Sequence, residues 1–374
     1  AFSGFVKLVD PFGTTYKFVD YFTAFGINAL DPLALPLAIL MSTLEFGMGI
    51  GLLLNLRSKL NTWGVSLFMA VFTPLTLYLA LENPVSDCGC FGDAIILTNW
   101  ETFYKNLLID LFIIVLLFNL RCFKPVFSVR TDSVGLGVIL VLAAGFGYYN
   151  STHLPLMDFR PYEIGVDIEK GMEIPEGKEG DTYGYDYTLQ NKETGQEKEV
   201  DSETYLAREM WKDTSWVIVE TSDPYLVKKG YTPPIHDLTM VARAPQSETG
   251  YPEGQDILDV ALADTSYSFW LVAYNLDRAD MEGMRHFAML ARYAKQKGYA
   301  FYGLTASGPE KMREVRNEVE AVFYFYNTDP ITLKTIVRAN PGLVLLKDGK
   351  IIDKWHYNDE PVPKEIEAAH PGMK

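Results

Sequence analysis

The sequence predicts a bundle of membrane helices followed by a larger α/β region outside the membrane. Residues 1–150 contain four long apolar runs and only ten acidic and eight basic residues, whereas residues 151–374 hold 38 acidic and 25 basic residues. Most of the net charge of -15 therefore lies in the second region. Beyond Tyr267, short apolar strands alternate with amphipathic helices, a pattern typical of a mixed sheet covered by helices.

Composition excludes two classes of protein. The acidic region offers no basic face that would neutralise phosphates, so we expect no nucleic-acid partner. The chain has three cysteines, and two of them form Cys88-Gly89-Cys90. Three are too few for a framework held together by disulfides.

The four apolar runs are long enough, or nearly so, to cross a hydrocarbon core of ~30 Å. They cover residues 35–54, 63–81, 103–120 and 134–149. Residues 1–9 are apolar apart from Lys7 and predict the end of an earlier span, with a signal-peptide remnant as the alternative. Residues 16–27 gather apolar side chains on one helical face, which predicts a short interfacial helix or an ordinary connector.

Basic residues predict the orientation. One set of loops holds five bases and the alternate loops, residues 10–34 and 82–102, hold only Lys17. The five are Arg57, Lys59, Arg121, Lys124 and Arg130. Because bases favour the cytoplasmic side, residues 82–102 and everything after residue 149 are predicted outside. We expect a protein of the bacterial inner membrane, in contact with the lipid bilayer and with its C-terminal domain in the periplasm.

Cys88 and Cys90 lie in this outer loop, directly after the second apolar run. Gly89 lets the chain bend so that the two Cα atoms come within the ~4.4–6.8 Å that a disulfide needs. So small a ring would exchange readily, which favours thiol–disulfide exchange. A soft metal such as Cu(I) is an alternative, although no His or Met lies within ten residues, and a purely structural pair is another. Cys122 is predicted on the opposite side, as an inert thiol.

Three ionisable residues lie within the apolar segments. Glu45 is in the middle of the first long run beside three glycines, and a carboxylate at that depth is a functional candidate. Lys7 and Asp110 lie in other segments. If the three meet, they form a polar cluster below the cysteine loop that would serve as a quinone or proton site. Snorkelling of Lys7 and Asp110, or a role in holding helices together, is the alternative.

The outer region divides into a connector, residues 151–260, and a domain, residues 261–374. In the connector, residues 182–189 and 196–200 predict a β-hairpin, and residues 216–220 a strand. In the domain, strands are predicted at 268–274, 300–305 and 322–326, helices at 279–296, 310–319 and 331–337, and a hairpin at 343–347 and 351–356.

The end of the domain resembles the TlpA/thioredoxin-like family. Asn340-Pro341 stands directly before the hairpin, where that fold keeps a cis-proline, and residues 340–355 follow the family's pattern. The resemblance implies a thioredoxin-like fold. It also implies a CxxC pair after the strand at 268–274, but this turn reads Asn275-Leu276-Asp277-Arg278. The domain is therefore expected to bind or dock rather than to carry a dithiol.

The membrane part resembles the DoxX-like superfamily, and within it the MauE branch. The resemblance rests on residues 2–7 with Asp10-Pro11, and on Cys88-Gly89-Cys90-Phe91-Gly92-Asp93. It implies a four-helix core, to which a further helix here would tether the outer domain. MauE proteins are associated with maturation of methylamine dehydrogenase, a disulfide-rich periplasmic enzyme. The resemblance thus implies a link to methylamine metabolism and a redox role for the cysteine pair.

We therefore hypothesise a redox-linked assembly factor. Cys88 and Cys90 would be the catalytic pair that exchanges disulfides with a periplasmic client or redox partner, and a membrane quinone would accept the electrons. The thioredoxin-like domain would recruit the client, and no metal site is predicted. A non-enzymatic membrane scaffold is the second hypothesis, and a small transporter is the third.

Overall fold

The computed structural model describes residues 1–85, 87–123 and 127–373. The chain divides into two compact units, one formed by Ala1–Val166 with Leu238–Lys374 and the other by Asp167–Asp237. Lys124, one of the five bases used above to predict orientation, lies outside the described residues.

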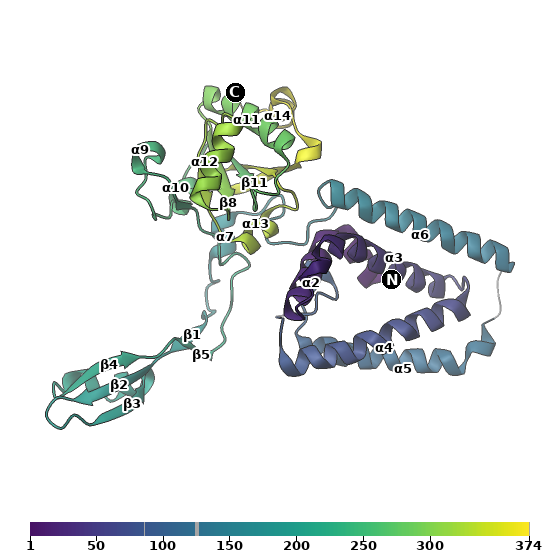
Figure 1. Cartoon of the computed structure of the whole chain (residues 1–374), viewed down its shortest axis with the longest axis horizontal. Coiled ribbons are helices and arrows are strands. Elements are labelled where there is room, and N and C mark those ends of the chain that lie inside the picture. Colours follow the sequence, from purple (N-terminus) through teal and green to yellow (C-terminus); the bar gives the residue numbers. More distant parts are fainter. Residues whose placement is uncertain (86, 124–126, 374) are drawn as a thin grey trace. The chain divides into compact units, whose positions relative to one another are not determined.

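The first unit begins with the helices of the membrane segment (Figure 1). They are α1 (Phe2–Val9), α2 (Pro11–Ala24), α3 (Ala34–Leu53), α4 (Ser58–Glu82), α5 (Asn99–Phe118) and α6 (Val129–Thr152). Within the described residues, three helical segments are long and apolar enough to cross a membrane: Asn28–Leu53, Ser58–Glu82 and Val129–Thr152. Their outward side chains are apolar, as at Leu67 and Val141, so the chain is a membrane protein.

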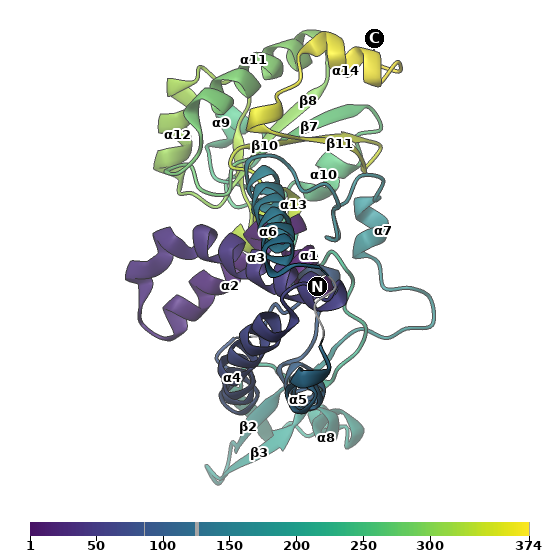
Figure 2. The same ribbon diagram turned by 90° about the vertical axis from the view of Figure 1, so that its right-hand side faces the viewer.

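α5 differs from these three segments in its charges. Its 20 residues include Glu101, Lys105 and Asp110. It lies side by side with α4 in both views (Figures 1 and 2). The run at 103–120 is thus a helix, as predicted, but it carries more charged residues than the other three.

Small residues allow the membrane helices to approach one another closely. A Cβ atom on Gly4 of α1 would lie 2.5 Å from the backbone nitrogen of Phe46 in α3, and one on Gly147 of α6 would lie 2.7 Å from Leu8. Gly4 and Gly147 therefore lie where helices of the bundle meet. α2 begins at Pro11, earlier than residue 16, because Asp10 caps it by accepting a hydrogen bond from the Gly13 amide at 3.1 Å.

The outer domain of the first unit is built on a six-stranded sheet of order β11-β10-β7-β8-β9-β6. β7, β8 and β9 run parallel, whereas β10 is antiparallel to β7 and β11, and β6 is antiparallel to β9. The strands are β6 (Val241–Ala242), β7 (Tyr267–Val272), β8 (Ala300–Thr305), β9 (Phe325–Asn327), β10 (Gly342–Lys347) and β11 (Lys350–His356).

Helices cover both faces of this sheet. They are α9 (Gln246–Thr249), α10 (Leu258–Leu262), α11 (Met281–Lys297), α12 (Pro309–Glu318), α13 (Pro330–Ile336) and α14 (Pro363–Ala369). Figure 2 shows α11 and α14 above the sheet, with α10 and α13 below it. Phe269 and Leu271 of β7 pack with Phe287 of α11 and Ile366 of α14 in one core. The alternating residues Trp270 and Val272, equally buried, point to the other face.

This βαβαβαββ order, with a cis bond between Asn340 and Pro341 just before β10, is a thioredoxin-like fold. The predicted strand at 322–326 starts later, at Phe325. β6 was not predicted, and it adds an edge strand from a segment assigned to the connector. The connector consequently forms a unit of its own only as far as Asp237.

The second unit contains α7 (Ile168–Met172), α8 (Ser202–Ala207) and five strands, β1 (Thr182–Gly184), β2 (Asp186–Asn191), β3 (Glu197–Asp201), β4 (Trp216–Thr221) and β5 (Tyr225–Lys228). β2 and β3 form the predicted hairpin, and β4 pairs with β2 on its other side. The predicted strand at 182–189 is divided, because β1 pairs with β5 instead.

Candidate functional site

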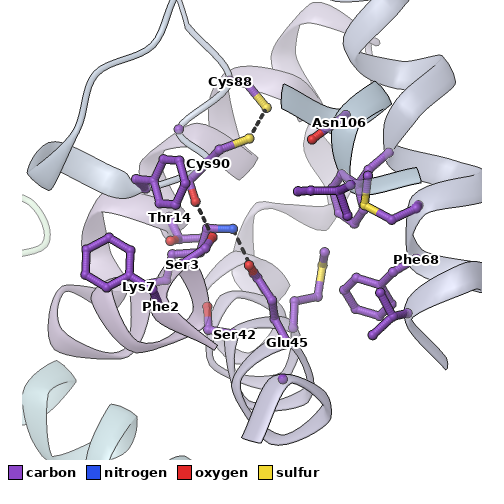
Figure 3. Close-up of a pocket in the computed structure, with 18 of the residues that line it drawn as sticks. Phe2, Ser3, Lys7, Thr14, Ser42, Glu45, Phe68, Cys88, Cys90 and Asn106 are labelled. Atoms are coloured by element: carbon purple, nitrogen blue, oxygen red, sulfur yellow. Dashed lines mark hydrogen bonds and ion pairs between the residues drawn. The ribbon is translucent and has the colours of Figure 1, made fainter. Parts of the chain in front are cut away.

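Cys88 and Cys90 lie in the loop that joins α4 to α5. Asn83 ends α4 in the left-handed region, with φ of 48°, and Thr98 with Glu101 forms a capping box at the start of α5. Between them Gly89 has φ of +65°, and this bend brings the two Sγ atoms to 3.1 Å from each other (Figure 3). The structure therefore brings the predicted pair together, with both side chains partly buried.

α1 and α2 hold the cysteine loop in place. Ser3 donates a hydrogen bond to the Cys90 carbonyl at 2.5 Å, and the Tyr21 hydroxyl donates one to the Cys88 carbonyl at 3.0 Å. Lys17 forms an ion pair with Asp87 at 2.7 Å. The loop is thus fixed by side chains from two helices rather than by its own turn alone.

A cavity of about 430 Å³ lies beneath the two cysteines. Its walls come from α1 to α5, and Cys88, Gly89, Cys90 and Phe91 close one end. Most of the lining is apolar, from α3 and α4. Three methionines, Met41, Met48 and Met69, are part of it, which sequence reasoning missed because they lie far from the cysteines along the chain.

Two of the three ionisable membrane residues meet in this cavity. Lys7 Nζ lies 2.9 Å from Glu45 Oε2, and both residues line the cavity (Figure 3). Asp110 does not join them. Its carboxylate accepts a hydrogen bond from Thr73 at 2.8 Å, between α5 and α4, and it is not part of the cavity wall. The predicted cluster of three is therefore a pair.

Lys105 of α5 is a site residue that sequence reasoning did not select. Its ammonium lies 4.9 Å from the centre of the Phe91 ring, and the residue lines the cavity beside the cysteines. The hydrogen bond with the Cys88 thiol lowers the pKa of Cys90, against the effect of burial, and the positive charges of Lys105 and Lys7 lower it further. The same hydrogen bond, with burial, raises the pKa of Cys88.

The reduced pair therefore releases its first proton easily and holds the second strongly. Of the two thiols, Cys90 has the lower pKa and more readily forms the thiolate, which is the reactive form of a cysteine. Cys88, whose pKa is raised, keeps its proton more readily. This division between a nucleophile and a resolving thiol is what disulfide exchange requires.

The cysteine loop also contacts the thioredoxin-like domain. Arg338, two residues beyond α13, places Nη2 at 2.6 Å from Asp93 Oδ2 and Nε at 2.9 Å from Asp10 Oδ2. The Arg338 side chain is 4% exposed. Asp10 and Asp93 both lie in the quoted MauE-like motifs, but nothing in the sequence pointed to Arg338 as their partner.

The turn that replaces CxxC lies beside the cis-proline. The Asn340 side chain donates a hydrogen bond to the Asn275 carbonyl at 2.8 Å, and the Asn340 carbonyl accepts one from the Asp280 amide at 2.9 Å. The sequence has no cysteine after residue 122. The thioredoxin-like domain therefore carries no cysteine pair.

Cys122 is exposed at the far end of α5, in the short turn Leu120–Cys122. The 20 residues of α5 separate it from the cysteine loop, a distance of ~30 Å along a helix. It stands apart from Cys88 and Cys90, and its predicted place on the opposite side of the membrane stays a prediction.

Comparison with known proteins gives one family match and several structural likenesses. Residues 1–120 match the family described as "Methylamine utilisation protein MauE". No curated protein matches the chain.

Three solved structures are similar to part of the chain. A putative protein disulfide isomerase from Bacteroides thetaiotaomicron is 13% identical with a TM-score of 0.27, over 37% of this chain and 83% of that one. The thioredoxin domain of a thiol-disulfide oxidoreductase from Bacteroides vulgatus is 14% identical with a TM-score of 0.26, over 32% and 88%. A PrxQ mutant from Xylella fastidiosa is 10% identical with a TM-score of 0.23, over 36% and 92%.

The assignment of the outer domain rests on its own strand order and its cis-proline, and that of the membrane part on the family match. Residues 1–120 of this chain match the MauE family, and they are joined through α6 and the connector to a thioredoxin-like domain.

Proposed function

We propose that this protein is a membrane-bound thiol–disulfide exchange factor that assists the maturation of proteins outside the cytoplasm. The observation that carries the proposal is the approach of Cys88 Sγ to Cys90 Sγ at 3.1 Å, beside the ammonium groups of Lys7 and Lys105. A MauE segment combined with a thioredoxin-like fold supports a redox-linked role.

The exchange balances with a client dithiol as the reductant. A client thiolate attacks the Cys88–Cys90 disulfide and forms a mixed disulfide, and the second client thiol then attacks the client sulfur. The client leaves with a new disulfide, and Cys88 and Cys90 hold the two electrons as a thiol and a thiolate. A membrane electron carrier then reoxidises the pair.

The thioredoxin-like domain is proposed to present the client to the cysteine loop. Arg338 ties the end of α13 to Asp93, three residues beyond Cys90, so a protein bound on the domain near the cis-proline would be close to the thiols. The basic loops predict that this side faces the periplasm and that the bilayer is the bacterial inner membrane.

Trapping of thiols in intact cells tests the proposal. Cells are quenched with acid, and free thiols are labelled with a reagent that shifts the protein on a gel. Cys88 and Cys90 should be found partly as a disulfide, and Cys88→Ser should accumulate a mixed disulfide between Cys90 and a client. Cys122→Ser is the matched control and should leave both results unchanged. A pair that stays fully reduced, with no change in any client when both are replaced, contradicts the proposal.

A non-enzymatic scaffold is the second candidate, and one observation favours it. Residues 275–278 include no cysteine where the thioredoxin-like resemblance implies a dithiol, so this domain is suited to binding alone. A scaffold predicts that a partner co-purifies equally with the wild type and with the variant in which both Cys88 and Cys90 are Ser. Thiol–disulfide exchange predicts instead that a partner bound through a disulfide to the wild type is absent from that variant.

A further inference from the structure

The cavity below the cysteines holds polar groups that the protein itself leaves unpaired. Thr14 of α2 and Ser42 of α3 both line it, and these residues are 7% and 1% exposed. Within the part of the chain that the structure describes, neither hydroxyl has a hydrogen-bond partner. Buried hydroxyls are rarely left unsatisfied, so two that line the same cavity point to a ligand.

The cavity is polar at one end and apolar along the rest. Lys7, Glu45 and Lys105 line the cavity together with the two hydroxyls. Figure 3 shows the Lys7 and Glu45 side chains pointing toward each other below the cysteines. The remaining wall includes Leu52 of α3 and Phe68 and Phe72 of α4. α3 and α4 are membrane-crossing helices, so this part of the cavity lies at the depth of the lipid chains.

This arrangement selects a small polar ring carried on an apolar tail. Hydroxyl and ammonium donors suit carbonyl oxygens, and the apolar wall suits an isoprenoid chain. An anionic lipid headgroup fits less well, because Glu45 and the Cys90 thiolate would repel it. A volume of about 430 Å³ is within the range of sites that hold a ligand of this size.

We propose that this cavity binds the ring of a membrane quinone, which accepts the electrons of the Cys88–Cys90 pair. The inference rests on the proposed function, because it names the carrier that reoxidises the pair. Thr14, Ser42 and Lys7 donate hydrogen bonds to the quinone oxygens. The cysteines close one end of the same cavity, so the bound quinone ring would contact the sulfur atoms that supply the electrons.

The transfer balances in two electrons and two protons. The Cys90 thiolate attacks the quinone ring, and Cys88 Sγ then attacks Cys90 Sγ. The sulfur–carbon bond breaks as the sulfur–sulfur bond forms, and the electron pair stays on the ring. The Cys88 proton goes to one quinone oxygen, and Lys7 passes a second proton from the aqueous side to the other. The quinol then leaves into the bilayer.

Binding is tested with the full chain in lipid nanodiscs, using decylubiquinone and menaquinone-4 as probes and quenching of protein fluorescence as the readout. We expect saturable binding of at least one probe. Ser42→Leu, which fills the polar end, should weaken binding at least ten-fold, and Ser42→Ala, which keeps the space but removes the hydroxyl, several-fold. Asp110→Asn is the matched control, because this membrane carboxylate bonds Thr73 outside the cavity, and it should bind as the wild type does.

Electron transfer is tested in the same nanodiscs. Prereduced wild type should convert one equivalent of quinone to quinol, whereas the variant with Ser at positions 88 and 90 should bind the probe but reduce none. Exchange with glutathione disulfide measures the thiol chemistry without quinone. Active exchange without quinone binding overturns this inference and leaves the proposed function standing. Binding that Ser42→Leu does not weaken, or that yields no quinol, also overturns the inference. Quinone binding with no exchange at all overturns the proposed function.

Discussion

Arg338 of the thioredoxin-like domain and Asp93 of the cysteine loop are 245 positions apart in the sequence and form a hydrogen-bonded ion pair with Nη2 and Oδ2 2.6 Å apart. The same guanidinium binds Asp10, the cap of α2. Asp10 and Asp93 belong to the two segments on which the family resemblance rests. Both segments are therefore joined to the end of α13. These contacts make the position of the loop dependent on the outer domain.

Replacing Arg338 should destabilise the protein strongly. Arg338→Ala leaves the buried Asp10 carboxylate without its cation, and breaking a buried pair in this way costs about 3–5 kcal/mol. The midpoint of thermal unfolding in nanodiscs should fall by several degrees. Arg285→Ala is the control, because Arg285 forms an exposed pair with Glu318 at 2.9 Å, and such pairs contribute about 1 kcal/mol or less. Equal effects of the two substitutions would contradict a structural role for the Arg338 bridge.

Lys105 should control the reactivity of Cys90. Its positive charge lowers the pKa of the Cys90 thiol, so Lys105→Met should raise that pKa and reduce the thiolate present at neutral pH. The rate of alkylation of reduced Cys90 should fall several-fold near pH 7, and its pH profile should move to higher pH. Lys59→Met removes the same charge at the start of α4, away from the cavity lining, and should leave the profile unchanged. A profile that is the same in both variants would argue against this role for Lys105.

The thioredoxin-like fold was predictable because its signals are local. The alternation of apolar residues gave the strands, and Asn340-Pro341 marked the turn before β10. The cysteine pair was predictable for the same reason, since only Gly89 separates the two residues. β6 was missed because a strand of two residues shows no periodicity, and its place depends on β9, far along the chain.

The site around the cysteines was predicted only in part. Hydropathy placed Lys7 and Glu45 within apolar segments, but it does not fix which side of a helix faces a cavity. Asp110 consequently turned out to bond Thr73 rather than join them. Arg338 could not be assigned from sequence, because its ion pairs depend on how the domain packs on the loop.

Gly89 should be less replaceable than Gly92, although both have positive φ. Alanine in this region costs about 1–2 kcal/mol at either position. At Gly89, however, the new Cβ would also lie 2.8 Å from Lys17 Cγ, whereas at Gly92 it would meet nothing within 4 Å. Gly89→Ala should therefore move Cys88 away from Cys90 and slow exchange with glutathione disulfide at least several-fold more than Gly92→Ala does. Equal rates in the two variants would show that the contact with Lys17 does not shape the bend.

His356 of β11 should make stability depend on pH. It is 2% exposed, and its Nδ1 accepts a hydrogen bond from the Asn358 amide at 3.0 Å, so the folded protein requires the neutral ring. Burial, aided by the nearby His153, lowers its pKa to about 4.

An unfolded histidine takes up its proton near pH 6.5, whereas the folded protein resists protonation until about pH 4. The stabilisation is therefore complete above about pH 6.5 and is lost as the pH falls through this window, by up to about 3 kcal/mol. The thermal midpoint of the wild type should drop between pH 7 and pH 5. In His356→Gln the drop should be smaller, because the substituted side chain does not titrate. The carboxylates that also titrate in this range are the same in both proteins, so their contribution cancels in the comparison. An identical pH dependence in the two proteins would mean that His356 is not held neutral by its surroundings.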